Sequence, residues 1–325
     1  MNDLELVQYA SSLASEWDAF VDQQANNGTL FHKRAFLAYH PADRFADDSL
    51  LFYKKGKLQA VLPAARRHGD EAKLLISHPG ASFGGFVVQP ELSLKDATAL
   101  VSMLKKYAKS QHYGGLDITL PPIVYLKRPS NYIDFALYNS GFRYRKREVS
   151  SVIPLDVSEE HVLQLLKAEA QRAVRRSQKL GVEVREDDDY ATFYDILKQN
   201  LKLRHNVIPT HSLEELQKLV SWFPERIKMF AAYAESQMVA GIVLFHANEK
   251  TTLAFYISHR EAFQKYRAVN HLFYEVFRWC VRNRFQFLDF GIFTVNMEPN
   301  WGLARFKESF GAQGVFRDSM QLALV

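Results

Sequence analysis

The stretch Leu288-Asp289-Phe290-Gly291-Ile292 is a short apolar run with one acidic residue, and the first half of the chain holds a similar one, Leu116-Asp117-Ile118-Thr119-Leu120. A run of this length and composition is typical of a buried strand. Each run follows a segment with apolar residues at helical spacing, residues 94–110 in the first half and 269–283 in the second. The same helix and the same strand are therefore predicted twice.

The similarity between the halves extends outward from these runs in both directions. Residues 50–62 and 229–245 each predict two strands joined by a tight polar turn. After each repeated run in the sequence, a short helical segment ends at a glycine. Glycine adopts the left-handed conformation that closes a helix without a side-chain penalty. The remaining matched elements are a third strand (73–77 and 251–258), the closing glycine (Gly141 and Gly311) and a last strand (151–155 and 320–325).

Two halves with the same order of elements indicate the duplication of one domain. We therefore predict an α/β fold with mixed sheets, built as two tandem domains over residues 1–156 and 157–325. A chain of 325 residues is long enough for both domains to bury a core. The second domain is expected to begin with one helix that Ser158 caps and that ends at Gly181.

Composition narrows the class of protein. Hydrophobic residues make up 47% of the chain, and no uncharged stretch approaches the length of a membrane span. The first residues lack a basic region followed by an apolar run, so we expect a cytoplasmic protein without a secretory signal. Cys280 is the only cysteine, which excludes an internal disulfide and a cysteine-rich metal site. Oligomeric state cannot be inferred.

Positive charge is concentrated in a few places. The formal net charge is +5 and the pI is about 9.0, which suggests an anionic partner. Helical spacing puts Arg172, Arg175, Arg176 and Lys179 on one face, and residues 143–147 form a second basic cluster. Substrate binding is one interpretation of these residues, and a solvated helix face with a charge-protected strand edge is the other.

Two segments of the second half resemble a known family. One is the basic helix Arg172-Ala173-Val174-Arg175-Arg176-Ser177-Gln178-Lys179-Leu180-Gly181-Val182. The other is Leu288-Asp289-Phe290-Gly291 followed by Arg305-Phe306-Lys307-Glu308-Ser309-Phe310-Gly311. Together they resemble the tandem GNAT (acyl-CoA N-acyltransferase) proteins of FemABX type, also described as FemAB or BioF2-like. The resemblance covers residues 158–325, and residues 1–156 resemble the family by element order alone.

The resemblance implies an acyltransferase that forms an amide or ester bond. The expected acceptor is an amine of a cell-wall or envelope-polysaccharide precursor, and the expected donor is aminoacyl-tRNA or acyl-CoA, with no permanently bound cofactor. GNAT proteins bind the pyrophosphate of coenzyme A on a glycine-containing loop, but the corresponding residues 260–270 contain no glycine. Lys265 and Arg267 are expected to contact phosphate with their side chains instead, which favours an aminoacyl-tRNA donor.

Several residues are candidates for chemistry or substrate binding. The resemblance implies a cleft where strands 251–258 and 285–294 diverge, with Lys307 positioned to neutralise the developing oxyanion. Asp289 is a candidate for proton transfer because burial can raise the pKa of a carboxyl group, although its repetition as Asp117 also favours a structural role. Arg204 and His205 are expected to bind substrate phosphate or carboxylate. No ligand spacing for a metal site is present.

Two alternatives to this function remain open. One is a coenzyme A-dependent N-acetyltransferase that acts on a sugar or a small amine. The other is a non-catalytic GNAT-fold binding scaffold in which both clefts are degenerate. Aromatic residues also crowd the C-terminal part, and they predict either core packing or a wall that binds a lipid or a sugar: Trp301, Phe306, Phe310 and Phe316.

Overall fold

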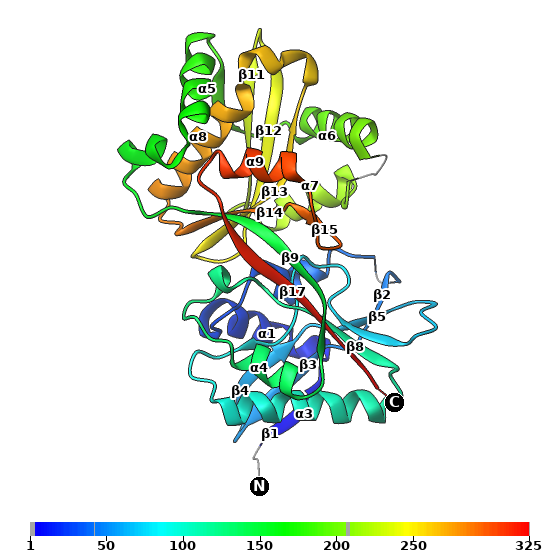
Figure 1. Ribbon diagram of the computed structural model, residues 1–325. Helices are drawn as coiled ribbons and strands as arrows, with labels where there is room; N and C mark the ends of the chain where they lie inside the picture. The colour runs from blue at the N-terminus through cyan, green and yellow to red at the C-terminus, as the bar shows by residue number, and fades with distance from the viewer. Residues whose placement is uncertain (1–3, 42, 206–208, 325) are drawn as a thin grey trace. The chain divides into compact units, whose positions relative to one another are not determined.

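The computed structural model describes residues 4–41, 43–205 and 209–324, and for residues 202–205 it describes the backbone alone. The chain divides into two compact units (Figure 1). Unit 1 consists of Met1–Val149 and Val315–Val325, and unit 2 consists of Ser150–Gly314.

Unit 2 is built on a mixed sheet in the strand order β10-β11-β12-β13-β14-β9. Its strands are β10 (Glu183–Asp187), β11 (Ile227–Ala234), β12 (Gln237–His246), β13 (Thr251–His259), β14 (Phe287–Ile292) and the second half of β9 (Arg143–Pro154), with a small hairpin of β15 (Thr294–Val295) and β16 (Glu298–Pro299). Its helices are η5 (Glu159–Leu165), α5 (Ala168–Lys179), α6 (Tyr190–His205), α7 (Leu213–Trp222), η6 (Glu261–Tyr266), α8 (Ala268–Arg282) and α9 (Trp301–Glu308).

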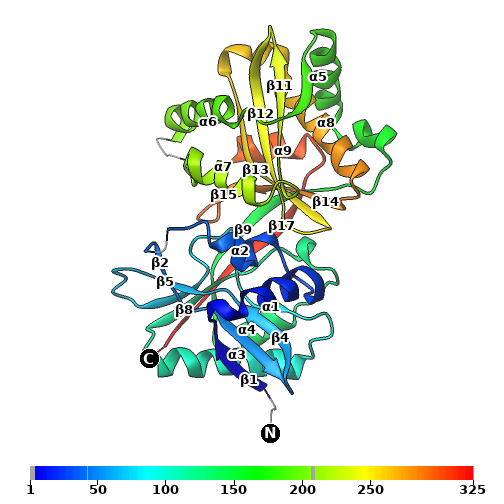
Figure 2. The same ribbon diagram turned by 180° about the vertical axis from the view of Figure 1, so that it is seen from behind.

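Helices cover both faces of the strands β11 to β13. Helices α5 and α8 share a core with one face, where Val174, Phe277 and Ile242 are among the buried residues. Helix α6 lies on the opposite face, and Phe193 packs so closely on Gly241 that a Cβ there would meet the ring (Figures 1 and 2). The sheet is therefore buried on both sides, as its continuous apolar strands predict.

Unit 1 contains two smaller sheets. In the first the strands have the order β1-β3-β4-β7, and in the second they have the order β17-β8-β6-β5-β2. The strands are β1 (Leu4–Gln8), β2 (Phe45–Asp47), β3 (Leu50–Lys54), β4 (Lys57–Leu62), β5 (Ala65–Arg67), β6 (Leu74–Ser77), β7 (Val87–Val88), β8 (Gly115–Thr119) and β17 (Gln313–Ala323). The helices are η1 (Ser11–Leu13), α1 (Ala14–Ala19), η2 (Phe20–Gln24), η3 (Leu30–His32), α2 (Arg34–Leu37), α3 (Leu94–Ser110), η4 (Ile123–Tyr125) and α4 (Tyr132–Asn139).

The order of elements repeats between the units, as the sequence predicts. The hairpin β3–β4 corresponds to β11–β12, and the sequence β6, α3, β8, α4 corresponds to β13, α8, β14, α9. One difference is that unit 1 divides the counterpart of β12 into β4 and β5 at Pro63, since proline has no N–H group for a sheet. The predicted α/β class with mixed sheets is confirmed.

The last strand of each half joins a sheet that sequence order does not reveal. Residues 152–154 of β9 pair with β14 in unit 2, and residues 319–323 of β17 pair with β8 in unit 1. The two compact units therefore differ at their ends from the two copies that the sequence repeat predicts. The division into domains 1–156 and 157–325 stays a prediction about the duplicated copies.

The single helix predicted between Ser158 and Gly181 is wrong, because the structure has two helices there. Helix η5 ends at Leu165 and α5 begins at Ala168. Lys167 between them is extended, and its N–H group donates to the carbonyl oxygen of Ser309 (2.8 Å). A tertiary hydrogen bond thus replaces the helical one. None of the described helices combines the length and the apolar composition that crossing a membrane requires.

Candidate active site

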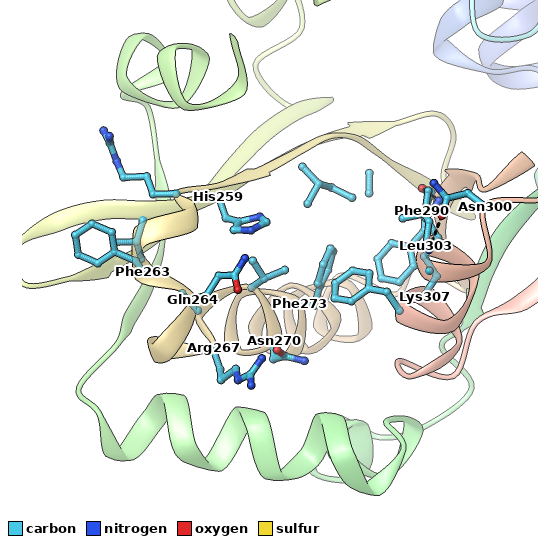
Figure 3. Close-up of a pocket in the computed structure, with 18 of the residues that line it drawn as sticks. His259, Phe263, Gln264, Arg267, Asn270, Phe273, Phe290, Asn300, Leu303 and Lys307 are labelled. Atoms are coloured by element: carbon cyan, nitrogen blue, oxygen red, sulfur yellow. Dashed lines mark hydrogen bonds between the residues drawn. The ribbon is translucent and has the colours of Figure 1, made fainter. Parts of the chain in front are cut away.

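A cleft of unit 2 opens between two neighbouring strands that run parallel for only a short distance. β13 pairs with β14 from Thr251–Phe287 to Leu253–Asp289, and β13 then continues to His259 while pairing with β12 on its other edge. The cleft beyond the last pair has a volume of about 770 Å³ (Figure 3). It is lined by the ends of both strands, by η6 and α8, and by α9. The predicted divergence of these strands is confirmed.

A β-bulge lies on the wall of this cleft. The register between β12 and β13 shifts where Val243 pairs with Tyr256 and Leu244 pairs with Ala254, so that Phe255 is the extra residue. Phe255 is half-buried and lines the cleft. Bulges redirect side chains and backbone groups, and they occur often beside active sites.

The two ends of the cleft differ in chemistry (Figure 3). At one end lie Gln264, Arg267 and Asn270, and at the other end α9 contributes Leu303 and Lys307. Arg260 and Phe306 also belong to the lining. None of the described residues that line the cleft is an aspartate or a glutamate. The positive charges of the lining residues are therefore not balanced within the lining, which favours an anionic ligand.

The cationic end coincides with the start of α8. Arg267 is the residue before the helix, it adopts the left-handed conformation (φ 55°), and no side chain caps the helix there. The first N–H groups of a helix have no acceptor within it and carry the positive end of the helix dipole. Backbone groups and the exposed Arg267 side chain thus present positive charge to the same end of the cleft. Residues 260–270 achieve this without a glycine.

Lys307 lies buried at the other end of the cleft, in α9. Its Nζ donates to three carbonyl oxygens at the end of β14: Phe290 (2.9 Å), Gly291 (2.8 Å) and Ile292 (2.9 Å). Burial lowers the pKa of Lys307 to about 8, and the nearby charge of Asp289 opposes that shift. All three protons of the ammonium group hold the backbone of β14, and the positive charge lies at the cleft wall.

Asp289 lies next to this arrangement but is not among the residues that line the cleft. It is buried, and its Oδ1 accepts hydrogen bonds from the hydroxyl of Ser150 (2.5 Å) and from the N–H group of Gly291 (2.7 Å). The counterpart Asp117 instead pairs with Arg145 at 3.1 Å. Asp289 therefore fixes the turn of the backbone whose carbonyls Lys307 binds.

The other basic candidates lie away from the lining. Lys265 is exposed, 3.7 Å from a carboxylate oxygen of Glu235 and over the ring of Tyr266. Four basic side chains are exposed on α5, which packs against α8 in the core of unit 2: Arg172, Arg175, Arg176 and Lys179. Arg204 and His205 end α6, and their side chains lie outside the described residues. Of the basic residues predicted to bind the donor, only Arg267 lines the cleft.

Sequence reasoning missed several polar residues of the lining, among them His259, Asn270 and Asn300. A signal for His259 was present in the sequence, because the third strand of each half runs into a histidine, His78 in the first half and His259 in the second. Asn300 caps α9 by accepting a hydrogen bond from the Leu303 N–H group (3.0 Å), a pattern that sequence can indicate. Among described residues, no group of three or more His, Cys, Asp or Glu side chains could hold a metal ion.

Comparisons with known proteins agree with this fold. Residues 166–308 match the family model of the acetyltransferase (GNAT) domain. A crystal structure of FemX is similar over 98% of this chain and 97% of that chain, with a TM-score of 0.77 and 15% identity. A tandem GNAT protein from the clavulanic acid biosynthesis pathway covers 98% of both chains, with a TM-score of 0.58 and 12% identity.

A third similar structure is the C-terminal domain of a putative lysylphosphatidylglycerol synthetase from Agrobacterium fabrum. It covers 85% of this chain and 84% of that chain, with a TM-score of 0.54 and 10% identity. No curated protein matches the chain. At these identities the structures show a shared fold, and they confirm the FemABX-like tandem GNAT fold that the sequence motifs predict.

Proposed function

We propose that the protein is an acyltransferase that joins an aminoacyl or acyl group to an amine, since residues 166–308 match the model of the GNAT acetyltransferase domain and the chain has a tandem GNAT fold. The amine would belong to a cell-wall or envelope-polysaccharide precursor. The observation that carries the proposal is the cleft where β13 and β14 separate, since the described residues of its lining include cations and no carboxylate.

The proposed donor lies along the cleft from its cationic end. Its phosphates would contact Arg260, Arg267 and the first N–H groups of α8, since a helix N-terminus and arginine both favour phosphate. The acyl carbonyl would then lie where β13 has lost its parallel partner, beside the bulge at Phe255. The similarity to the domain of a putative lysylphosphatidylglycerol synthetase supports transfer of an aminoacyl group.

The proposed reaction is an addition followed by an elimination. The nitrogen of the acceptor amine attacks the acyl carbonyl carbon, forming the new C–N bond and placing negative charge on the carbonyl oxygen. Collapse of this intermediate breaks the bond to the ribose oxygen of tRNA or to the sulfur of coenzyme A. The amine loses one proton, and the leaving group gains one.

Lys307 has two parts in this proposal. Its hydrogen bonds hold the carbonyls of Phe290, Gly291 and Ile292, which fixes the cleft wall. Its positive charge stabilises the oxyanion through space, and burial strengthens that interaction because the local dielectric constant is low. Asp289 is a positioning residue that keeps Gly291 in place for Lys307. Arg204 and His205 remain proposed contacts of the acceptor.

Binding measurements separate the two donors. Isothermal calorimetry with aminoacyl-tRNA should show binding that weakens steeply as salt rises, because each phosphate contact releases a counterion. Acetyl-CoA should bind much more weakly under the same conditions. Absence of tRNA binding at low salt would contradict the aminoacyl-tRNA donor.

A coenzyme A-dependent N-acetyltransferase is the second candidate function. The start of α8 is compatible with it, since the pyrophosphate of coenzyme A can bind the same N–H groups as a phosphate of tRNA. Micromolar binding of acetyl-CoA, together with release of free thiol in the presence of a sugar amine or small amine, would decide for this candidate.

A further inference from the structure

The segment that leads from β14 into α9 carries a group of large apolar side chains that face solvent. Val295, Met297 and Trp301 are 67%, 54% and 75% exposed, and they lie on the hairpin β15–β16 and at the start of α9. Leu303 and Phe306 of α9 are also exposed. We call these five residues the apolar rim. Exposed apolar residues scattered over a surface are normal, but several of them on one short segment indicate a binding surface.

The local backbone favours other residues at the tip of this hairpin. Asn296 and Met297 both have positive φ (52° and 67°), as a two-residue hairpin turn requires. Asparagine tolerates this conformation and glycine is usual at the second position, whereas methionine is unfavourable there. An apolar side chain therefore occupies the tip against local preference. Positions where local rules are broken are often functional.

The apolar rim is continuous with the cleft. Leu303 and Phe306 belong to both, and Phe306 packs against the ring of Phe273 inside the cleft. The cationic end around Arg267 is at the opposite end of the cleft (Figure 3). A partner that covers the rim would therefore contact the end of the cleft that the phosphates of the proposed donor do not occupy.

The charge of this segment indicates which partner fits. Glu298 and Arg305 are the charged residues between positions 294 and 306, so the segment has no net charge. A projecting turn with apolar side chains and a tryptophan is suited to the boundary between lipid headgroups and acyl chains. We propose that the apolar rim docks on a lipid surface through apolar contacts, which brings the α9 end of the cleft to the headgroups.

Another exposed aromatic group of the chain provides a contrast. In unit 1 the guanidinium of Arg147 lies over the rings of Tyr144 and Phe316, 4.4 and 4.0 Å from their centroids. That group and the basic face of α5 would attract anionic lipid through charge, with strong dependence on salt. Docking through the apolar rim needs neither anionic lipid nor low salt.

The test is sedimentation of the full chain with vesicles of pure phosphatidylcholine at low and high salt. The wild-type protein should bind in both, and the triple variant Val295→Ser, Met297→Ser, Trp301→Ser should partition about tenfold less, because three exposed apolar side chains no longer enter the lipid. Trp222→Ser and Phe316→Ser are matched controls, since these side chains are 45% and 54% exposed outside the rim. Both should bind as the wild type does.

Three results would overturn the proposal. The first is no binding of wild type to phosphatidylcholine. The second is binding that requires phosphatidylglycerol, disappears at high salt and persists in the triple variant. The third is self-association of the wild type that the triple variant loses, because a second copy would then be the partner of the rim. Equal melting temperatures of wild type and variant would show that the variant is folded, and the vesicle measurement does not depend on the transfer reaction.

Discussion

Each unit contains one pair of parallel strands at the equivalent place in its order of elements, β6 with β8 in unit 1 and β13 with β14 in unit 2. The two pairs differ in whether the strands stay together to their ends. In unit 1, β6 pairs with β8 along its whole length, and the following loop stays attached because the Gly84 N–H group donates to the Thr119 carbonyl (2.9 Å). In unit 2, β13 and β14 separate after Leu253–Asp289 and the cleft begins. One fold thus gives a closed end in one copy and an open end in the other.

The difference comes from the loops behind the strands. The glycine-rich loop of residues 79–85 closes unit 1, since a Cβ at Gly84 would lie only 1.9 Å from the Ser77 carbonyl oxygen. Phe83 of the same loop is buried against Phe31 and Tyr125. The glycine-free loop of unit 2 instead forms η6 and leads to the uncapped start of α8. In unit 1, glycine allows the loop to pack closely on the strand. In unit 2, the corresponding loop has no glycine and the cleft stays open.

The largest expected effect concerns Lys307, which distinguishes the open copy. Lys307→Met should lower the rate of donor turnover per folded molecule by about 100-fold or more, because the oxyanion loses its nearby charge. Three carbonyls lose their donor as well, so the free energy of unfolding should fall by about 1–3 kcal/mol. Donor affinity should change little.

Arg305→Ala is the control for this variant, because Arg305 is exposed on the same helix and does not line the cleft. Equal turnover numbers for wild type and Lys307→Met would remove Lys307 from the chemistry.

The next effect concerns the closed end of unit 1. Gly84→Ala should lower the free energy of unfolding by about 2–3 kcal/mol, since the new methyl group has to displace backbone. Gly302→Ala in unit 2 is the matched control, because its nearest atom would be 3.6 Å away. Chemical denaturation measures both. Similar stabilities of the two variants would contradict the tight closure of unit 1.

A smaller effect separates two basic residues of one loop. Arg267→Ala should weaken donor binding about tenfold, as expected for loss of one charged phosphate contact, and should lower the salt slope of tRNA binding by about 1. Lys265→Ala should have no effect, because Lys265 lies outside the lining. Calorimetric titration with each donor measures the difference. An equal loss in both variants would mean that the loop attracts the donor only through its overall charge.

The smallest effect is a dependence of stability on pH. Burial lowers the pKa of Lys307 to about 8, so above pH 8 the folded state holds fewer protons than the unfolded state. The stability of the wild type should therefore rise relative to Lys307→Met, by about 1 kcal/mol between pH 8 and pH 9. Urea unfolding of both proteins at these pH values gives the difference. A flat difference would mean that Lys307 keeps its ordinary pKa.

Much of the fold could be predicted because local signals repeat. Apolar spacing located α3 and α8 almost to the residue, and the paired Leu-Asp runs located β8 and β14. The divergence of β13 and β14 followed from the family resemblance. The pairing of the last strand of each half with the other unit's sheet, β9 with β14 and β17 with β8, was not predictable. An apolar strand fits either sheet equally well by composition.

The candidate site was predicted less completely. Lys307 and Arg267 line the cleft as expected, but the three carbonyl partners of Lys307 depend on a bulge of β14 that leaves no local signal. The basic residues of α5 lie on one helical face, and that face is exposed to solvent. Helical spacing predicts which residues share a face, but it does not predict what that face contacts. The aromatic group of the C-terminal part divides in the structure, with Phe310 in the core and Trp301 exposed.

The central claim is that the donor binds where β13 and β14 separate. A crystal structure of the protein with an aminoacyl-tRNA analogue or with coenzyme A tests it most directly. We predict density for the acyl carbonyl beside Phe255 and for phosphate at Arg267 and the start of α8. A donor bound elsewhere, with the cleft of unit 2 empty, would contradict the account.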